Sequence, residues 1–156
     1  MGSCQEKEPT AVKVEKYNHG ELMDTSNVEI IKNIEETRIS IVFKGDLTDT
    51  LYYFMIISDN KNEIEFMGHK SELVDRKTFD ADGEQVEILK YRYDLEDGVD
   101  EELDFYLTAD GDVLGFRELA WNGYEIFLQD KNLQILKLLT SDTTDFFKYN
   151  YRFHYL

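Results

Sequence analysis

Apolar and polar residues alternate along much of the chain with the period of two that is typical of β-strands. The alternation is clearest in Thr37–Lys44, where every second residue from position 39 is isoleucine or phenylalanine. Leu51–Ser58 is apolar throughout, which predicts a central strand covered on both faces. Asn27–Ile31 predicts a further strand, whereas residues 5–27 are polar and contain only a possible short strand at Val12–Tyr17.

Three glycines, each preceded by Asp or Asn, predict tight turns between strands. Asp82-Gly83, Asp110-Gly111 and Asn122-Gly123 are the pairs that two-residue type I′ hairpin turns favour, because both central residues of such a turn need a positive φ. The three turns imply apolar cross-strand pairs: Phe79 with Val86, Leu107 with Leu114, Phe105 with Phe116, Trp121 with Tyr124, and Leu119 with Ile126.

The last quarter of the chain is less regular. Asn132–Leu139 is apolar enough for a strand or a helical turn, and Ser141–Asp145 offers capping residues that predict a short helix near residues 141–147. In Phe147–Tyr155 five aromatic residues alternate with polar ones, which we interpret as the inner face of the last strand. The alternative is an exposed aromatic platform on which a sugar stacks.

Together these patterns predict a mainly β fold with at most one short helix, that near residues 141–147. We expect an antiparallel meander of about eight or nine strands, arranged as a sandwich or a partly closed barrel. Residues 1–11 are expected to form a flexible tether, and residues 12–156 a single β-rich domain, because 156 residues match the size of one domain. Small barrels are filled by side chains and larger ones enclose ligands, so a filled interior and a cavity are both open alternatives.

The chain is strongly acidic, with 33 acidic and 17 basic residues and a net charge of −16. Between Thr78 and Phe116 there are 13 acidic residues and two basic ones, a local charge of −11. Such a field repels nucleic acid and attracts a basic protein or a cation. Most charge runs are solvated surface, but a partner-facing acidic patch is the candidate site here: Asp94, Glu96, Asp97, Asp100, Glu101, Glu102 and Asp104. The same cluster leaves a weak calcium site open.

No catalytic or metal-binding motif stands out. The nucleophile-elbow, zinc-protease, P-loop and dinucleotide-binding patterns are absent from the sequence, and neither Asp-Gly loop fits the EF-hand spacing. We interpret Asp82, Asp110 and Asp112 as turn residues and His69 as a surface loop residue. The expectation is therefore a protein that is not an enzyme and holds no cofactor, although a glycosidase-type carboxylate pair is an open alternative.

The N-terminus carries the only cysteine, Cys4, directly after Gly2-Ser3. This arrangement resembles the end of a bacterial lipobox, and the charged, Pro9-containing run that follows resembles the tether and surface-export signal of Bacteroidetes lipoproteins. On this interpretation Cys4 is lipidated and the hydrophobic half of the signal peptide is missing. The alternative is a cloning remnant with a stray thiol; eukaryotic myristoylation fails because position 6 is Glu6.

A second resemblance lies in the back half of the chain. Lys90–Asp94, Asp100–Tyr106, Gly115 and Ala120–Asn122 resemble residues of small uncharacterised lipoproteins of the Bacteroidetes, over roughly residues 86–129. The resemblance implies a secreted, β-rich lipoprotein without assigned catalytic residues.

We therefore expect a non-enzymatic, monomeric protein of the bacterial cell envelope. It would be anchored in the outer membrane through Cys4, periplasmic or surface-exposed, and would present a surface to a partner or ligand. The alternatives are an acidic immunity-type protein that caps a basic toxin or enzyme, and a carbohydrate-binding module. The expected partners are accordingly a basic protein or a glycan, with no nucleic acid and no membrane contact other than the lipid.

Overall fold

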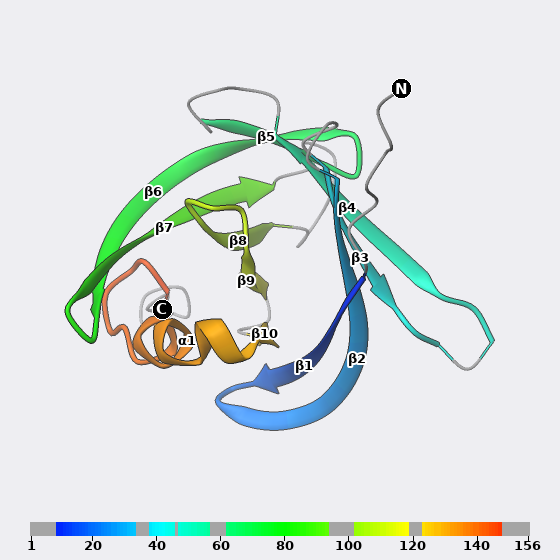
Figure 1. Ribbon diagram of the computed structural model, residues 1–156, viewed down its shortest axis with the longest axis horizontal. Coiled ribbons are helices and arrows are strands. Elements are labelled where there is room, and N and C mark those ends of the chain that lie inside the picture. Colours follow the sequence, from blue (N-terminus) through cyan, green and yellow to red (C-terminus); the bar gives the residue numbers. More distant parts are fainter. Residues whose placement is uncertain are drawn as a thin grey trace, which may run out of the picture.

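The fold is a closed antiparallel β-barrel. A computed structural model of the chain describes residues 9–33, 38–45, 47–56, 62–93, 102–118 and 123–147. The ten strands in these residues follow the order β1-β10-β9-β8-β7-β6-β5-β4-β3-β2 around the barrel, so consecutive strands are neighbours and β1 pairs with β10 (Figure 1). The predicted mainly β, antiparallel architecture with a single short helix is confirmed, as a barrel rather than a sandwich.

The elements have the following bounds: β1 Thr10–Asn18, β2 Glu21–Asn33, β3 Arg38–Phe43, β4 Thr50–Ile56, β5 Glu63–Phe66, β6 His69–Ala81, β7 Glu84–Tyr93, β8 Leu103–Thr108, β9 Val113–Glu118, β10 Gly123–Leu128, the 3₁₀ turn η1 Asp130–Asn132 and the helix α1 Leu133–Thr140.

Three of the hairpins use the X-Gly turn in which both residues have positive φ. Asp82-Gly83, with φ of 53° and 88°, joins β6 to β7 and places Phe79 opposite Val86, as predicted. His19-Gly20 and Met67-Gly68 have the same signature and join β1 to β2 and β5 to β6. The polar composition of residues 5–27 had concealed the first of these two hairpins.

The Asp110-Gly111 connection is not a type I′ turn. Only Gly111 has positive φ there, and a bulge in the β8–β9 pairing places Leu107 opposite Val113 instead of the predicted Leu114. Phe105 and Phe116 are paired as predicted. A bulge inserts one extra residue into one strand, so Leu114 turns to the outside of the barrel.

The prediction of a two-residue turn at Asn122-Gly123 is also wrong, because Gly123 is already in β10, opposite Glu118 of β9. Ile126 therefore faces Gly115 and not Leu119. Residues 119–122, including Trp121, lie outside the described residues. The observed register therefore differs from the predicted one by four residues.

The helix precedes its predicted position. It spans Leu133–Thr140 because Ile135, Leu136 and Leu139 form one buried face, whereas residues 141–147 form turns. The Asp142 carboxylate accepts hydrogen bonds from the Thr144 backbone NH at 2.7 Å and hydroxyl at 2.6 Å, which hold a turn and not a helix.

Two further expectations are corrected. Leu51 is 44% exposed, so the outer face of β4 is not covered at this residue, although β4 lies between β3 and β5. Phe147 is buried against the outside of the barrel, not on the inner face of a last strand. The rest of the predicted strand, residues 148–156, lies outside the described residues.

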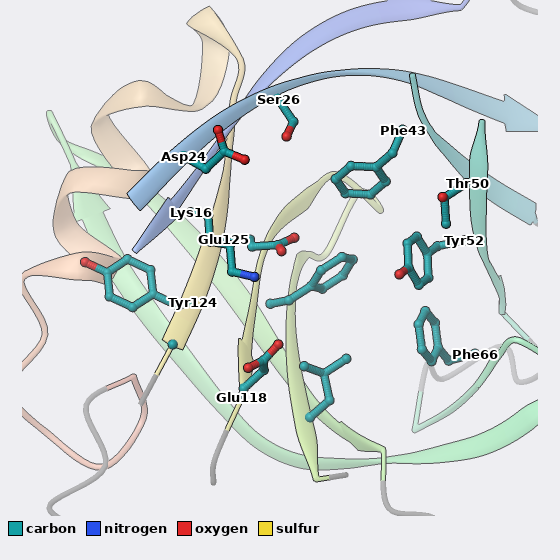
Figure 2. Close-up of a pocket in the computed structure, with 13 residues that line it drawn as sticks. Lys16, Asp24, Ser26, Phe43, Thr50, Tyr52, Phe66, Glu118, Tyr124 and Glu125 are labelled. Atoms are coloured by element: carbon teal, nitrogen blue, oxygen red, sulfur yellow. The ribbon is translucent and has the colours of Figure 1, made fainter. Parts of the chain in front are cut away.

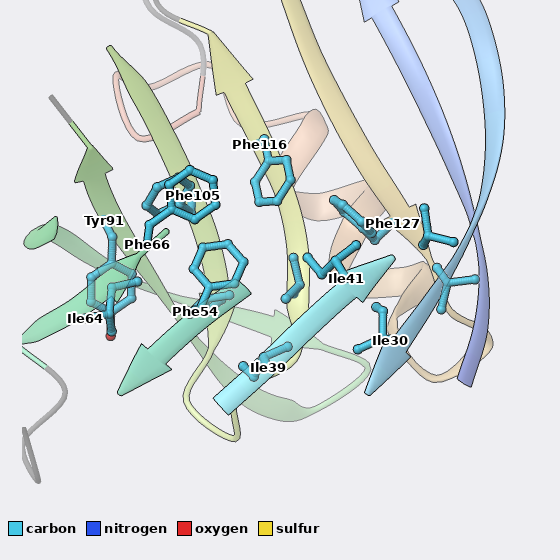
Figure 3. Packing of buried hydrophobic residues seen from close by; sticks show 14 of the residues in the cluster. Ile30, Ile39, Ile41, Phe54, Ile64, Phe66, Tyr91, Phe105, Phe116 and Phe127 are labelled. Carbon is cyan, nitrogen blue, oxygen red and sulfur yellow. The ribbon is translucent and has the colours of Figure 1, made fainter. Parts of the chain in front are cut away.

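The barrel interior is filled mainly by aromatic and β-branched side chains (Figure 3). Phe54 is fully buried, with ring centroids 5.0 Å from Phe66, 5.1 Å from Phe105 and 5.9 Å from Phe116. Rings at these separations and tilts add favourable quadrupole interactions to the burial of apolar area. This packed layer forms a floor across the middle of the barrel.

A second apolar layer lies outside the barrel, between the strands and α1. Ile88, Tyr106, Leu114 and Ile126 of β7–β10 pack there with the buried face of α1 and with Phe146 and Phe147. The Tyr106 hydroxyl donates a hydrogen bond of 2.7 Å to the Phe146 carbonyl oxygen. The strands under α1 are thus covered on both faces.

The β8–β9 connection closes one end of the barrel. Asp112 is 7% exposed and its carboxylate binds Lys32 of β2 and, at 3.0 Å, Lys131 of η1. A Cβ added to Gly111 would lie 3.8 Å from the Ile39 side chain, so the loop reaches β3. Asp112 is therefore a cross-barrel ion-pair residue and not a simple flank of a turn.

Candidate functional site: a cavity at the open end of the barrel

The end of the barrel opposite Asp112 holds a cavity of about 330 Å³. It opens where β1, β3 and β9 end and where β4, β8 and β10 begin (Figure 2). Small-molecule sites in proteins measure about 300–1,000 Å³, so this cavity is at the small end of that range. Its floor is the packed aromatic layer and its rim carries the charged groups.

The inward-facing side chains change from apolar in the core to polar at the cavity, because every second residue of a strand faces the barrel interior. On β1 the inward-facing residues Val12 and Val14 belong to the core, and the next one, Lys16, lines the cavity. The same change along the inner face occurs on four other strands: Val28 to Ser26 and Asp24 on β2, Phe54 and Tyr52 to Thr50 on β4, Phe116 to Glu118 on β9, and Phe127 to Glu125 on β10.

One wall of the cavity is aromatic. Tyr52 and Phe66 lie parallel, with ring centroids 6.1 Å apart and an interplanar angle of 4°. Phe43 meets Tyr52 edge-on at 5.5 Å, and Phe116 contributes to the lining from β9. Such a wall offers π-faces to a flat apolar group, to a sugar ring or to a cation.

The facing wall is acidic. Figure 2 shows Asp24, Glu118 and Glu125 on the side away from the three rings Phe43, Tyr52 and Phe66. Lys16 is directly opposite both Asp24 on β2 and Glu125 on β10 in the strand register. Three carboxylates and one ammonium give the lining a formal charge of −2.

Glu125 is the most enclosed of these carboxylates, whereas Asp24 and Glu118 are exposed. Burial raises the pKa of Glu125 above its ordinary value; Lys16 acts to lower it and the nearby Glu118 carboxylate raises it further. Neighbouring carboxylates, here the exposed Glu118 and the half-buried Glu125, repel each other when both are charged. The acidic wall therefore favours any group that brings positive charge or hydrogen-bond donors.

Gly123 and Tyr124 shape the rim. A Cβ on Gly123 would lie 3.6 Å from the Glu118 carboxylate, so glycine leaves open space beside that group. The Tyr124 ring points away from the cavity (Figure 2) and stacks on Tyr17 at 5.0 Å on the outer face. Tyr124 thus borders the cavity without presenting its ring to it.

The carboxylates do not form a metal centre. Among the described residues, no group of three or more His, Cys, Asp or Glu side chains is placed to hold a metal ion. Neither Asp82 nor Asp110 joins the cavity: Asp82 is in its turn and accepts a hydrogen bond from Gln134 of α1, and Asp110 is exposed in the β8–β9 connection.

The acidic patch predicted from the sequence is only partly described. Asp94, Glu96, Asp97, Asp100 and Glu101 lie outside the described residues, and Glu102 is exposed. Asp104 is fully buried, so the prediction that it belongs to a partner-facing surface patch is wrong. The physical reason is its position in β8, where Arg92 and Arg117 occupy the opposite positions on β7 and β9.

Asp104 is the acidic centre of a buried charge cluster on the outer wall. Arg92 donates two hydrogen bonds to it, of 2.9 Å and 3.2 Å, and the Lys90 ammonium is 3.7 Å away. Burial lowers the pKa of Lys90, and Asp104 acts against that shift. Lys90 also donates a 3.0 Å hydrogen bond to the Asp145 carbonyl oxygen, which ties the segment after α1 to the barrel.

His69 is not among the residues that line the cavity. His69 begins β6 and meets Tyr93 edge-on at 5.9 Å, so it is a strand residue and not a loop residue. Cys4 lies outside the described residues.

The cavity residues themselves were missed. A usable signal was present in the alternation, which continues on the inner face but switches to charged residues at Lys16, Glu118 and Glu125.

In the part of the chain that the structure describes, no helix has the length and apolar character of a membrane span. Comparison with protein-family models gave no match, and comparison with curated proteins gave no similar sequence.

Proposed function

We propose that the protein is a non-enzymatic binding protein that takes a small amphiphilic ligand into the open end of its barrel. The observation that carries the proposal is the division of the cavity into an aromatic wall, with Tyr52 and Phe66 in parallel, and an acidic wall with Glu118 and Glu125. Apolar lining with a few placed polar groups is the usual composition of small-molecule sites.

The volume limits the size of the ligand. At ~30 Å³ per non-hydrogen atom, the volume that a water molecule occupies in the liquid, a cavity of about 330 Å³ holds on the order of ten such atoms. A larger molecule would have to leave part of itself outside the rim. The proposal therefore concerns the size of a single aromatic amine or a monosaccharide, not a lipid.

The cellular context of the proposal rests on the sequence. Cys4 would carry a lipid that anchors the domain to the bacterial outer membrane, with residues 1–11 as the tether. Labelling cells that express the complete gene with radioactive palmitate tests this part: label is expected in the natural protein and is lost in Cys4→Ala. Label that persists in Cys4→Ala, or is absent from both proteins, contradicts the anchor.

Of the two alternatives, the carbohydrate-binding module has support from the described residues. Aromatic rings beside carboxylates are a common way to hold a sugar, because the ring face packs on apolar C–H groups and the carboxylates accept hydrogen bonds. The immunity-type alternative is weakened by Asp104, which pairs with Arg92 inside the protein and is not offered to a partner.

Amide NMR of ¹⁵N-labelled protein tests the binding proposal. We expect a panel of aromatic compounds and monosaccharides of about ten non-hydrogen atoms to include at least one that shifts the amides of Lys16, Glu118, Gly123 and Glu125. Shifts elsewhere only, or no shifts at 10 mM of any compound, would overturn the proposal. Gly123→Val, which places a branched side chain beside the Glu118 carboxylate, should abolish the shifts that the natural protein gives.

A further inference from the structure

We propose, on the basis of the binding function above, that the ligand of the cavity is an organic cation. It would be a protonated amine or quaternary ammonium group joined to a flat apolar body, with the charged end between Glu118 and Glu125 and the body along Phe43 and Tyr52. This assigns a chemical class to the ligand that the binding proposal alone leaves open.

The charge of the lining supports a cation. Three of the residues that line the cavity carry carboxylates (Asp24, Glu118 and Glu125), and one, Lys16, carries an ammonium. In the strand register Lys16 lies opposite Asp24 on β2 and Glu125 on β10. The excess charge of −2 lies inside a chain of net charge −16. The field of such a protein concentrates cations at the cavity and repels anions.

The relation between Glu118 and Glu125 points in the same direction. Their mutual repulsion and the burial of Glu125 disfavour its charged form. A cation placed between the two carboxylates removes that repulsion and replaces lost hydration with charge-assisted hydrogen bonds. A neutral or anionic ligand leaves the repulsion in place or increases it.

The aromatic wall accepts the same class of ligand. A cation is attracted to the face of a tyrosine or phenylalanine ring within about 6 Å, and the apolar body of the ligand gains from burial against the floor formed by Phe66 and Phe116. A metal ion would use only the carboxylates, which do not form a metal-binding group among the described residues. An organic cation uses both walls.

The test compares three small molecules that differ mainly in charge: 2-phenylethylammonium, 2-phenylethanol and phenylacetate. Dissociation constants are measured at pH 7.5 by titration of the amide shifts of the full chain. We expect the ammonium compound to bind about tenfold more tightly than the alcohol, because a hydrogen bond to a charged group contributes a free energy of about this size in proteins. Phenylacetate should bind more weakly than both.

Two variants and a matched control locate the effect. Glu125→Gln and Glu118→Gln should each reduce the advantage of the ammonium compound over the alcohol severalfold, while binding of the alcohol changes little. Glu84→Gln removes the same charge from the exposed start of β7, outside the cavity, and should leave the ratio unchanged. A ratio that falls equally in all three variants would mean a general charge effect and would overturn the assignment to this pair.

The outcomes separate this inference from the binding proposal. If 2-phenylethanol, phenylacetate or glucose shifts the cavity amides as strongly as the ammonium compound, the barrel is a binding protein but its ligand is not a cation. If none of the compounds shifts those amides, the binding function fails as well. Benzyltrimethylammonium, which has no N–H donor, tests the quaternary ammonium part of the proposal. It should also bind more tightly than 2-phenylethanol, and weaker binding than the alcohol would overturn that part.

Discussion

Asp104→Asn replaces a fully buried carboxylate with a neutral amide of almost the same shape. The substitution keeps the volume of the side chain but removes the counter-charge of Arg92 and Lys90, which lie 2.9 Å and 3.7 Å from it. Breaking a buried ion pair from one side costs about 3–5 kcal/mol, because the remaining charge is left without compensation. We expect a value of about 3 kcal/mol, at the low end, since the Arg92 side chain is 34% exposed and partly hydrated.

Urea denaturation followed by circular dichroism measures this loss. For a domain with a slope of about 2 kcal/mol per molar urea, a loss of about 3 kcal/mol lowers the midpoint by about 1.5 M. Asp110→Asn is the matched control, because Asp110 is exposed in the β8–β9 connection, and it should change stability by less than about 0.5 kcal/mol. A loss below about 1 kcal/mol in Asp104→Asn would refute the assignment of a buried ion pair.

The pH dependence of the stability difference between the natural protein and Asp104→Asn gives a second check. Burial already lowers the pKa of Lys90, and Asp104 opposes that shift, so the substitution lowers the pKa of Lys90 further. Above this lowered value and below the unfolded value of about 10.4, the unfolded chain binds more protons than the folded one, so the stability of the variant rises with pH. The difference in free energy of unfolding between the natural protein and the variant should therefore become smaller from pH 7 to pH 10. A constant difference would contradict the role of Lys90.

Three further substitutions test the packing and the closed end of the barrel. Gly115→Ala places a Cβ 2.6 Å from the Glu125 carbonyl oxygen of the next strand, which should cost about 1–3 kcal/mol, whereas Gly123→Ala, with its nearest atom at 3.5 Å, should be tolerated; equal losses in urea would contradict this close approach. Phe54→Ala removes a fully buried ring and should cost about 3–5 kcal/mol, and a loss near that of a surface substitution would argue against the packed floor. Burial acts to raise the pKa of Asp112, but hydrogen bonds from two lysines outweigh it and lower that pKa. The stability that Asp112 contributes is therefore present above the unfolded pKa of about 3.9 and is lost as pH falls through the lowered value. Asp112→Asn should therefore lose less stability than the natural protein when the pH is lowered. An equal loss of stability in the two proteins would show that the ion pairs of Asp112 do not form.

The sequence predicted the strand content because burial in a sheet imposes its own period. Where one face packs on the core, as in β3 with Ile39 and Ile41, apolar residues must recur at every second position. The Asp82-Gly83 turn was also predictable, because its conformation is set by two residues and needs no distant partner. These features are local.

The predictions from the sequence fail where residues that are distant in the sequence determine the local structure. Asp110-Gly111 has turn chemistry, but the adjacent Asp112 is bound by Lys32, which is 80 positions away in the sequence, and the β8–β9 pairing contains a bulge. Neither the contact nor the bulge is set by the two turn residues. The helix could not be placed from capping residues alone, since its position depends on the apolar layer that Tyr106 and Leu114 present on the outside of the barrel. An alternation pattern does not say what covers the second face.

The cavity was missed for a related reason. A charged residue at an inward position, such as Lys16 or Glu125, looks like a solvated strand end until the ring of strands is closed around it. Only the β1–β10 pairing brings the two together. The sequence contained the switch from apolar to charged side chains, but not the direction in which those side chains face.

The pairing of β1 with β10 has a consequence for how the chain reaches this state. A nascent chain that stops before residue 123 lacks the strand that completes the ring, so β1 and β9 would each expose a row of unpaired backbone NH and carbonyl groups. β1 must wait for β10 before its hydrogen bonds are complete, and such sequence-distant pairing slows folding. Until β1 and β10 meet, these two edges are the part of the barrel most open to pairing with another chain.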